Sequence, residues 1–124
     1  MKKQGTTPHL IFHAILSASS VTATFMAQVY MESDNALSEG EKDIARMIAS
    51  MVEEAEAIQG YQQRIAVSKD PEVKKIIEHA QKEEMEHFAT ELEWLARKMP
   101  AWRQKLEQIL FKDGDIIENA KKHE

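Results

Sequence analysis

Two residues three positions apart, Glu84 and His87, have the side chains and the spacing to bind a metal ion together. On an α-helix this spacing places a carboxylate and an imidazole on one face, about 5–6 Å apart at their Cβ atoms. A Glu-x-x-His pair is what one helix contributes to a carboxylate-bridged di-iron site in a helical bundle. The pair alone is weak evidence, because glutamate is common and every histidine has some residue three positions before it.

The surroundings of this pair strengthen the metal interpretation. A helix is predicted over residues 71–98, because apolar residues recur there in steps of three and four: Val73, Ile77, Ala80 and Trp94. Glu84 and His87 occupy steps of the same series, where a residue facing the core is expected. A buried carboxylate costs several kcal/mol unless it is paired or binds a metal. A satisfied core histidine remains the alternative for His87, and a packing role is expected for the methionines.

A third candidate ligand, Glu54, lies on the apolar side of a preceding helix that is predicted from Ser38 to about Val67. Its apolar series is Ile44, Met47, Met51, Ile58, Tyr61 and Ile65. Ser38 and Glu41 have the spacing of a capping box at its start. Asp70 and Pro71 are expected to begin the second helix after a short turn. Glu54 and Glu84 lie fifteen residues on either side of Lys69, so both should stand roughly 22 Å from that turn.

These patterns predict an all-α protein whose central part, residues 38–111, is an antiparallel two-helix hairpin with a short third helix over 101–111. Residues 1–37 form an N-terminal extension of uncertain status, and residues 112–124 form a charged tail expected to fray. A ferritin-like di-iron site takes one Glu from each of two helices and a Glu-x-x-His from each of two others. This hairpin supplies half of that set. Dimerisation about a two-fold axis is therefore expected to complete the four-helix bundle.

The amino-acid composition limits the kinds of partner and metal site that the protein can have. The net charge of −5 argues against nucleic acid as the main partner. The absence of cysteine excludes disulfides, thiolate zinc sites and iron–sulfur clusters, and leaves carboxylate and imidazole ligands suited to iron, manganese or zinc.

The first thirty residues are open to two interpretations. Lys2 and Lys3 precede an apolar run over residues 10–16 that loosely matches a secretory signal peptide. The alternative is that translation starts at Met31. The run is too short to span a bilayer, so no membrane association is expected.

The residues around the candidate ligands also match a known pattern. The stretch from Ile48 to Phe111 resembles the encapsulated ferritin family, whose members are ferroxidase cargo of encapsulin nanocompartments. The matching segments are residues 53–58, 61–64, 70–72, 83–87, 92–95 and 110–111.

The resemblance implies a ferroxidase that oxidises Fe(II) to Fe(III) for iron storage at a di-iron centre, with Glu54, Glu84 and His87 as the ligands. It implies that Tyr61 lies beside these ligands, and that Glu53 and Glu56 form a site where iron enters. It further implies a homo-oligomer of two-fold dimers, with a decameric ring as one candidate. The expected location is the cytoplasm, inside an encapsulin compartment, with the shell protein as partner.

Two departures from the family are visible. Gly60 stands where the family carries an aromatic residue, and the sequence reaches Glu124 without the apolar docking peptide of the family's C-terminal extension. Two other functions stay open. One is a non-catalytic metal-binding hairpin that holds an oligomer together, and the other is a rubrerythrin-like peroxidase, which the lack of cysteine disfavours. Glu83 and Glu86 could also belong to an ordinary solvated acidic face.

Overall fold

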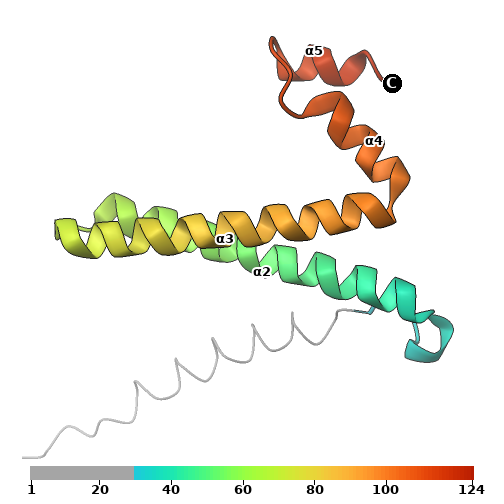
Figure 1. Ribbon diagram of the computed structural model, residues 1–124, viewed down its shortest axis with the longest axis horizontal. Helices are drawn as coiled ribbons and strands as arrows, with labels where there is room; N and C mark the ends of the chain where they lie inside the picture. Colours follow the sequence, from blue (N-terminus) through green and yellow to red (C-terminus); the bar gives the residue numbers. More distant parts are fainter. Residues whose placement is uncertain (1–29) are drawn as a thin grey trace, which may run out of the picture. The chain divides into compact units, whose positions relative to one another are not determined.

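The computed structural model of the protein describes residues 30–124, and all regular structure within that range is helical. The elements are η1 (Asp34–Ala36), α2 (Glu39–Val67), α3 (Pro71–Lys98), α4 (Pro100–Ile109) and α5 (Ile116–Lys121), as Figure 1 shows. The prediction of an all-α protein is confirmed. The two interpretations of the N-terminal segment concern residues outside the described range, apart from Tyr30. The single turn η1 belongs to a unit separate from the helices that follow.

The hairpin of α2 and α3 begins and ends close to the predicted residues. α2 starts directly after Ser38 and ends at Val67, and the two helices run antiparallel, side by side (Figure 1). The Asp70 carboxylate caps α3 by accepting from the backbone N–H groups of Glu72 at 2.8 Å and Val73 at 3.2 Å. Pro71 occupies the first helical position, where its missing N–H costs nothing. The expected turn chemistry is therefore confirmed.

The protected side of α3 differs slightly from the predicted one. It includes Gln81 and Leu95, which are buried, while Val73 is exposed. The apolar surface of α3 is broader than α2 alone covers, because Ile76 and Ala80 continue a second series at helical spacing. Ile76 is exposed to solvent, and we call the side that carries Val73, Ile76 and Ala80 the open side of the hairpin.

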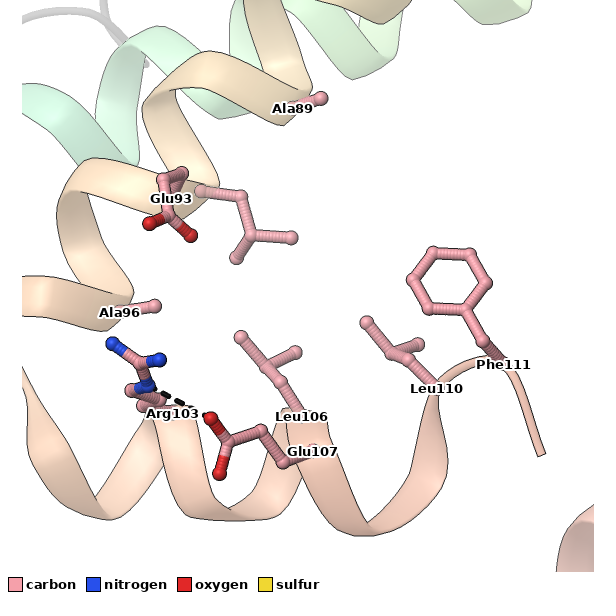
Figure 2. Close-up of a pocket in the computed structure, with 9 residues that line it drawn as sticks. Ala89, Glu93, Ala96, Arg103, Leu106, Glu107, Leu110 and Phe111 are labelled. Atoms are coloured by element: carbon pink, nitrogen blue, oxygen red, sulfur yellow. Dashed lines mark hydrogen bonds and ion pairs between the residues drawn. The ribbon is translucent and has the colours of Figure 1, made fainter.

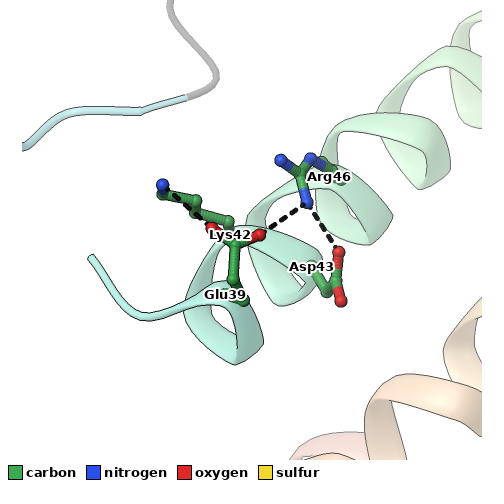
Figure 3. A network of polar contacts seen from close by, with 4 residues as sticks. All are labelled: Glu39, Lys42, Asp43 and Arg46. Carbon is green, nitrogen blue, oxygen red and sulfur yellow. Dashed lines mark hydrogen bonds and ion pairs between the residues drawn. The ribbon is translucent and has the colours of Figure 1, made fainter. Parts of the chain in front are cut away.

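Ion pairs surround the first turns of α2. Figure 3 shows Lys42 paired with Glu39 at 3.1 Å, and Arg46 paired with Asp43 at 2.7 Å and with Glu39 at 3.9 Å. Glu39 lies in the first turn, where a negative charge is favoured by the helix dipole. Ion pairs of this kind at the protein surface contribute little to stability individually. They support the first turns of α2 and do not hold α2 against α3.

The third predicted helix is present but shorter than expected. α4 begins at Pro100, leaves the end of α3 at a sharp angle and ends at Ile109 (Figure 1). Phe111, two residues later, has a φ of 58°, a left-handed conformation that cannot continue a right-handed helix. A cavity of about 310 Å³ lies between α3 and α4 (Figure 2). Its lining is mainly apolar: Ala89, Leu92, Ala96, Leu106, Leu110 and Phe111, with Glu93 and the Arg103–Glu107 ion pair at its edge.

The expectation of a frayed tail was wrong. Residues 116–121 form α5, because the Asp115 carboxylate accepts from the backbone N–H of Glu118 at 2.9 Å and caps the helix. Lys105 on α4 donates to the backbone carbonyl of His123 at 3.1 Å, which holds the end of the chain against α4. None of the helices in residues 30–124 is long and apolar enough to cross a membrane.

Candidate metal centre

Three ligand-type side chains meet in the hairpin: Glu54 from α2, and Glu84 and His87 from α3. One ligand atom of each lies within 4.8 Å of the others. His87 Nδ1 is 3.0 Å from Glu84 Oε2 and 4.0 Å from Glu54 Oε1. The expectation that these residues stand at one level of the hairpin agrees with this geometry. Their role as ligands stays a prediction.

The three side chains differ in exposure. Glu54 and Glu84 are largely covered, with 20% and 23% of the side chain exposed, whereas His87 is 60% exposed. His87 therefore does not lie in the core of the single hairpin. It follows Ala80 at a spacing of two helical turns, so it projects on the open side. A cation held by all three groups would sit at the edge of the hairpin and not at its centre.

Electrostatics couple the three groups in the absence of metal. The pKa of Glu54 is raised from 4.5 to about 6, chiefly by its side-chain hydrogen bond with Glu84. Burial and the nearby charges of Glu84 and Glu91 act in the same direction. The pKa of Glu84 is lowered, first by the same hydrogen bond and next by the hydrogen bond with His87. Glu84 thus accepts hydrogen bonds from both neighbours, and its hydrogen bond with His87 raises the pKa of that imidazole.

Two interhelical hydrogen-bond links bracket this group, and sequence analysis missed both. On the side of the turn, Gln81 Nε2 donates to the Ile58 carbonyl at 3.2 Å and to Gln62 Oε1 at 2.9 Å. On the other side, Ser50 Oγ donates to Glu91 Oε1 at 2.5 Å. Polar residues at core-facing steps were the available signal, since Gln81 follows Ile77 by four and precedes Glu84 by three.

The structure does not bring the other predicted residues into the three-residue group. Glu53 and Glu56 are exposed on α2. Tyr61 is half-buried, and its ring lies 5.7 Å from the guanidinium carbon of Arg64. α2 runs through Gly60 without interruption, and a Cβ there would meet no atom of residues 30–124 within 4 Å, so these residues leave room for a side chain.

The donor set suits iron. Two carboxylates and one imidazole are hard to borderline ligands of the kind that bind iron, manganese and zinc in proteins.

His79, in contrast, is 77% exposed and pairs with Glu83 at 3.4 Å on the outer surface of α3, as expected for a surface histidine.

A helical hairpin with a Glu on one helix and a Glu-x-x-His on the other has half of the residue pattern of a ferritin-like di-iron bundle. Comparison with known proteins agrees. The EncFtn-like family model matches residues 29–113, and the chain belongs to this family. Two relatives of the chain are named ferritin-like proteins, which supports an iron-related, ferritin-like function.

Individual relatives support the assignment. A ferritin-like protein of Thermotoga maritima is 45% identical over 93 residues, which cover 75% of this chain and 82% of that protein. An encapsulated ferritin-like protein of Rhodospirillum rubrum is 45% identical over 71 residues, which cover 57% of this chain and about half, 51%, of that protein. The crystal structure of protein ne0167 from Nitrosomonas europaea superposes with a TM-score of 0.67 at 41% identity, covering 70% of this chain and 96% of that one.

Proposed function

We propose that the protein is a ferroxidase that oxidises Fe(II) to Fe(III) at a di-iron centre formed between two subunits, for iron storage inside an encapsulin compartment. The observation that carries the proposal is the meeting of Glu54, Glu84 and His87 within 4.8 Å at the edge of one hairpin. These are half of the ligands that a ferritin-like centre needs.

The second half would come from an identical hairpin. The open side carries exposed Val73 and Ile76 and, about three to four turns further along α3, the exposed His87, so it offers both apolar surface and ligands to a partner. In an isologous interface each residue faces its own copy or that copy's neighbours. Two copies then supply four carboxylates and two imidazoles around the two-fold axis.

The chain's own residues have separate tasks at this centre. Glu54, Glu84 and His87 must exchange the hydrogen bonds among them for bonds to a cation, with both acids as carboxylates and with a ring nitrogen of His87 free. Iron held there by the carboxylates and imidazoles would supply the two electrons that dioxygen or peroxide takes up, one from each Fe(II). Hard carboxylate oxygens favour Fe(III), while the imidazole nitrogen also holds Fe(II). Tyr61 is proposed to line the site from α2, and Glu53 and Glu56 to attract Fe(II) from solvent.

The proposed compartment rests on the relatives. The Rhodospirillum protein is named as encapsulated, which supports an encapsulin shell as partner and the interior of such a compartment, in the cytoplasm, as the location. A ring of two-fold dimers, with ten subunits as a candidate number, is the proposed assembly. One hairpin with short terminal helices is too small to build a ferritin cage by itself.

Aerobic addition of Fe(II) to the purified protein tests the function, with ferric absorbance followed against a protein-free control. Wild type should oxidise iron faster than the control, and Glu54→Ala, Glu84→Ala and His87→Ala should each lose most of the bound iron. His79→Ala is the matched control, because this histidine lies on the same helix outside the centre. Wild-type iron stoichiometry in all three ligand variants would refute the assignment.

Sedimentation velocity with and without Fe(II) tests the intersubunit site. A cation that binds only the assembled form stabilises it by mass action, so iron should strengthen association. A chain that stays monomeric while it holds two irons would contradict the shared centre. Metal-driven association without Fe(II) oxidation would favour the alternative function, a metal-binding hairpin that holds an oligomer together.

A further inference from the structure

The hydrogen bond between Ser50 and Glu91 joins α2 to α3, but it leaves one buried carboxylate oxygen without a partner in the described part of the chain. Glu91 Oε1 accepts a hydrogen bond from Ser50 Oγ on α2 at 2.5 Å. Glu91 Oε2 is buried and has no hydrogen-bond partner within the described part of the chain. A buried acceptor without a partner is unfavourable, and more so when it carries charge. The link therefore includes a negative charge that the hydrogen bond itself does not need.

The same hairpin contains a link without this cost. Gln81 joins α3 to α2 with a neutral amide that donates twice, and neither of its side-chain polar atoms is left buried without a partner. A glutamine at position 91 could accept from Ser50 through its carbonyl oxygen in the same way. The carboxylate at this position consequently needs an explanation other than holding two helices together.

The position of Glu91 next to the Glu54–Glu84–His87 group suggests why a carboxylate stands there. It follows His87 by four residues and Glu84 by seven, so it lies on their side of α3, one turn beyond the group. Ser50 precedes Glu54 by four residues on α2, at the matching level. The charge of Glu91 is one of the causes that raise the pKa of Glu54, so the two groups interact electrostatically without touching.

We propose that Glu91, held by Ser50, is a positioning residue whose fixed negative charge favours the ferric over the ferrous state at the Glu54–Glu84–His87 centre. This inference rests on the proposed function. In the two-fold centre, four ligand carboxylates balance two Fe(II) ions but leave two Fe(III) ions with two positive charges in excess. One Glu91 from each subunit, one helical turn away, supplies the two charges that are missing.

The equilibrium potential of the iron-loaded protein tests the proposal, because it measures the ratio of Fe(III) to Fe(II) affinity and not the rate of turnover. Glu91→Gln keeps the size of the side chain and an acceptor for Ser50 but removes the charge. We expect this ratio to fall roughly tenfold, which is a shift of about 59 mV to more positive potential for a one-electron couple.

Three controls separate charge from structure. Glu93→Gln makes the same change two residues away, at the edge of the cavity between α3 and α4, where Glu93 is exposed and pairs with Arg97, and it should leave the potential unchanged. Gln81→Ala breaks the neutral link and should lower stability without moving the potential. Ser50→Ala removes the hydrogen bond but keeps the charge and should shift the potential less than Glu91→Gln.

Each contrary result has a distinct meaning. An unchanged potential in Glu91→Gln, with wild type binding and oxidising iron, overturns this inference alone. A shift of equal size in Glu93→Gln, Gln81→Ala or Ser50→Ala also overturns it, because the effect would then not come from a buried charge near the centre. A wild-type protein that binds no iron overturns the proposed function and the inference together.

Discussion

The two halves of the α2–α3 hairpin are built on different principles. In the half next to the turn, residues 58–81, Gln81 makes two hydrogen bonds and Asp70 caps α3 with two more. In the other half, residues 39–57 and 82–98, Glu54, Glu84 and Glu91 gather beside a largely exposed His87. A buried oxygen of Glu91 there has no hydrogen-bond partner among residues 30–124.

The half next to the turn thus stabilises the hairpin, whereas the half with Glu54, Glu84 and Glu91 is arranged for a bound cation. Like charges gathered at one point oppose folding unless a cation or shared protons relieve them. The turn half can supply stability without metal, whereas the half with the carboxylates gains most when a cation binds. The comparison therefore predicts that substitutions in the turn half lower stability, while substitutions in the other half alter metal binding.

The largest difference in metal-free stability is expected between Gln81→Ala and His87→Ala. Gln81→Ala removes a buried side chain with two interhelical hydrogen bonds and should cost about 1–3 kcal/mol. His87→Ala removes an exposed side chain and should change the stability by less than about 0.5 kcal/mol. Urea unfolding of the metal-free protein at pH 7 measures both values, and equal losses would contradict the comparison.

The next largest loss is expected from Asp70→Ala. Removal of an N-cap carboxylate that accepts two backbone N–H groups should lower the free energy of unfolding by about 1 kcal/mol. Iron stoichiometry should stay at the wild-type value, because the cap lies far along the hairpin from Glu54 and Glu84. Asp70→Asn keeps a capping oxygen and is the matched control. If Asp70→Ala lost iron as the ligand variants do, the two halves would not be separable.

Much of this arrangement was predictable from local patterns. The helix limits near Val67 and Pro71, and the common level of Glu54 and Glu84, follow from turn chemistry and from counting residues along two helices of fixed rise. The family followed from motifs around these residues and is confirmed by the EncFtn-like match. Such features are set by residues close together in sequence, so they can be predicted without knowing how the helices pack.

Other features depend on how one helix is rotated against another. Gln81 is buried because α3 is rotated so that this side chain meets Ile58 and Gln62 on α2, about twenty residues away in sequence. Apolar periodicity alone leaves the rotation of α3 uncertain by part of a turn. The same uncertainty placed His87 in the core, although it is exposed. The tail was missed for a different reason: Asp115 and Glu118 have capping-box spacing, but a six-residue helix is too short for its periodicity to be visible.

The pH dependence of metal-free stability sharpens the comparison with a smaller effect. Because the pKa of Glu54 is raised from 4.5 to about 6, its contribution is fully present below pH 4.5 and is lost as pH rises through about 6. The raised pKa of His87 acts in the same direction, with its contribution lost as pH rises above 6.5. The lowered pKa of Glu84 acts oppositely, and its contribution is lost only as pH falls below 4.5.

Between pH 5 and 8 the metal-free protein should therefore lose stability as pH rises, through the half that carries Glu54 and His87. Thermal unfolding across this range checks the slope. The Glu54→Gln/His87→Gln double variant should show a shallower dependence than wild type, whereas Gln81→Ala, in the turn half, should keep the wild-type slope at lower stability. Parallel curves for wild type and the double variant would show that these groups do not cause the pH dependence.

The smallest effect is expected at Glu53 and Glu56, which are exposed on α2 next to Glu54. If their role is to raise the local concentration of Fe(II), the Glu53→Gln/Glu56→Gln variant should oxidise iron about two- to fivefold more slowly, with the centre still fully occupied at equilibrium. The difference should shrink as salt screens the two charges. A Glu72→Gln/Glu118→Gln variant removes the same net charge far from the centre and should keep the wild-type rate. Stopped-flow absorbance at low and high salt measures the rates, and equilibrium iron counting measures the occupancy. Loss of bound iron in the Glu53/Glu56 variant would instead make these two carboxylates ligands, and the charged half of the hairpin would then extend to the surface of α2.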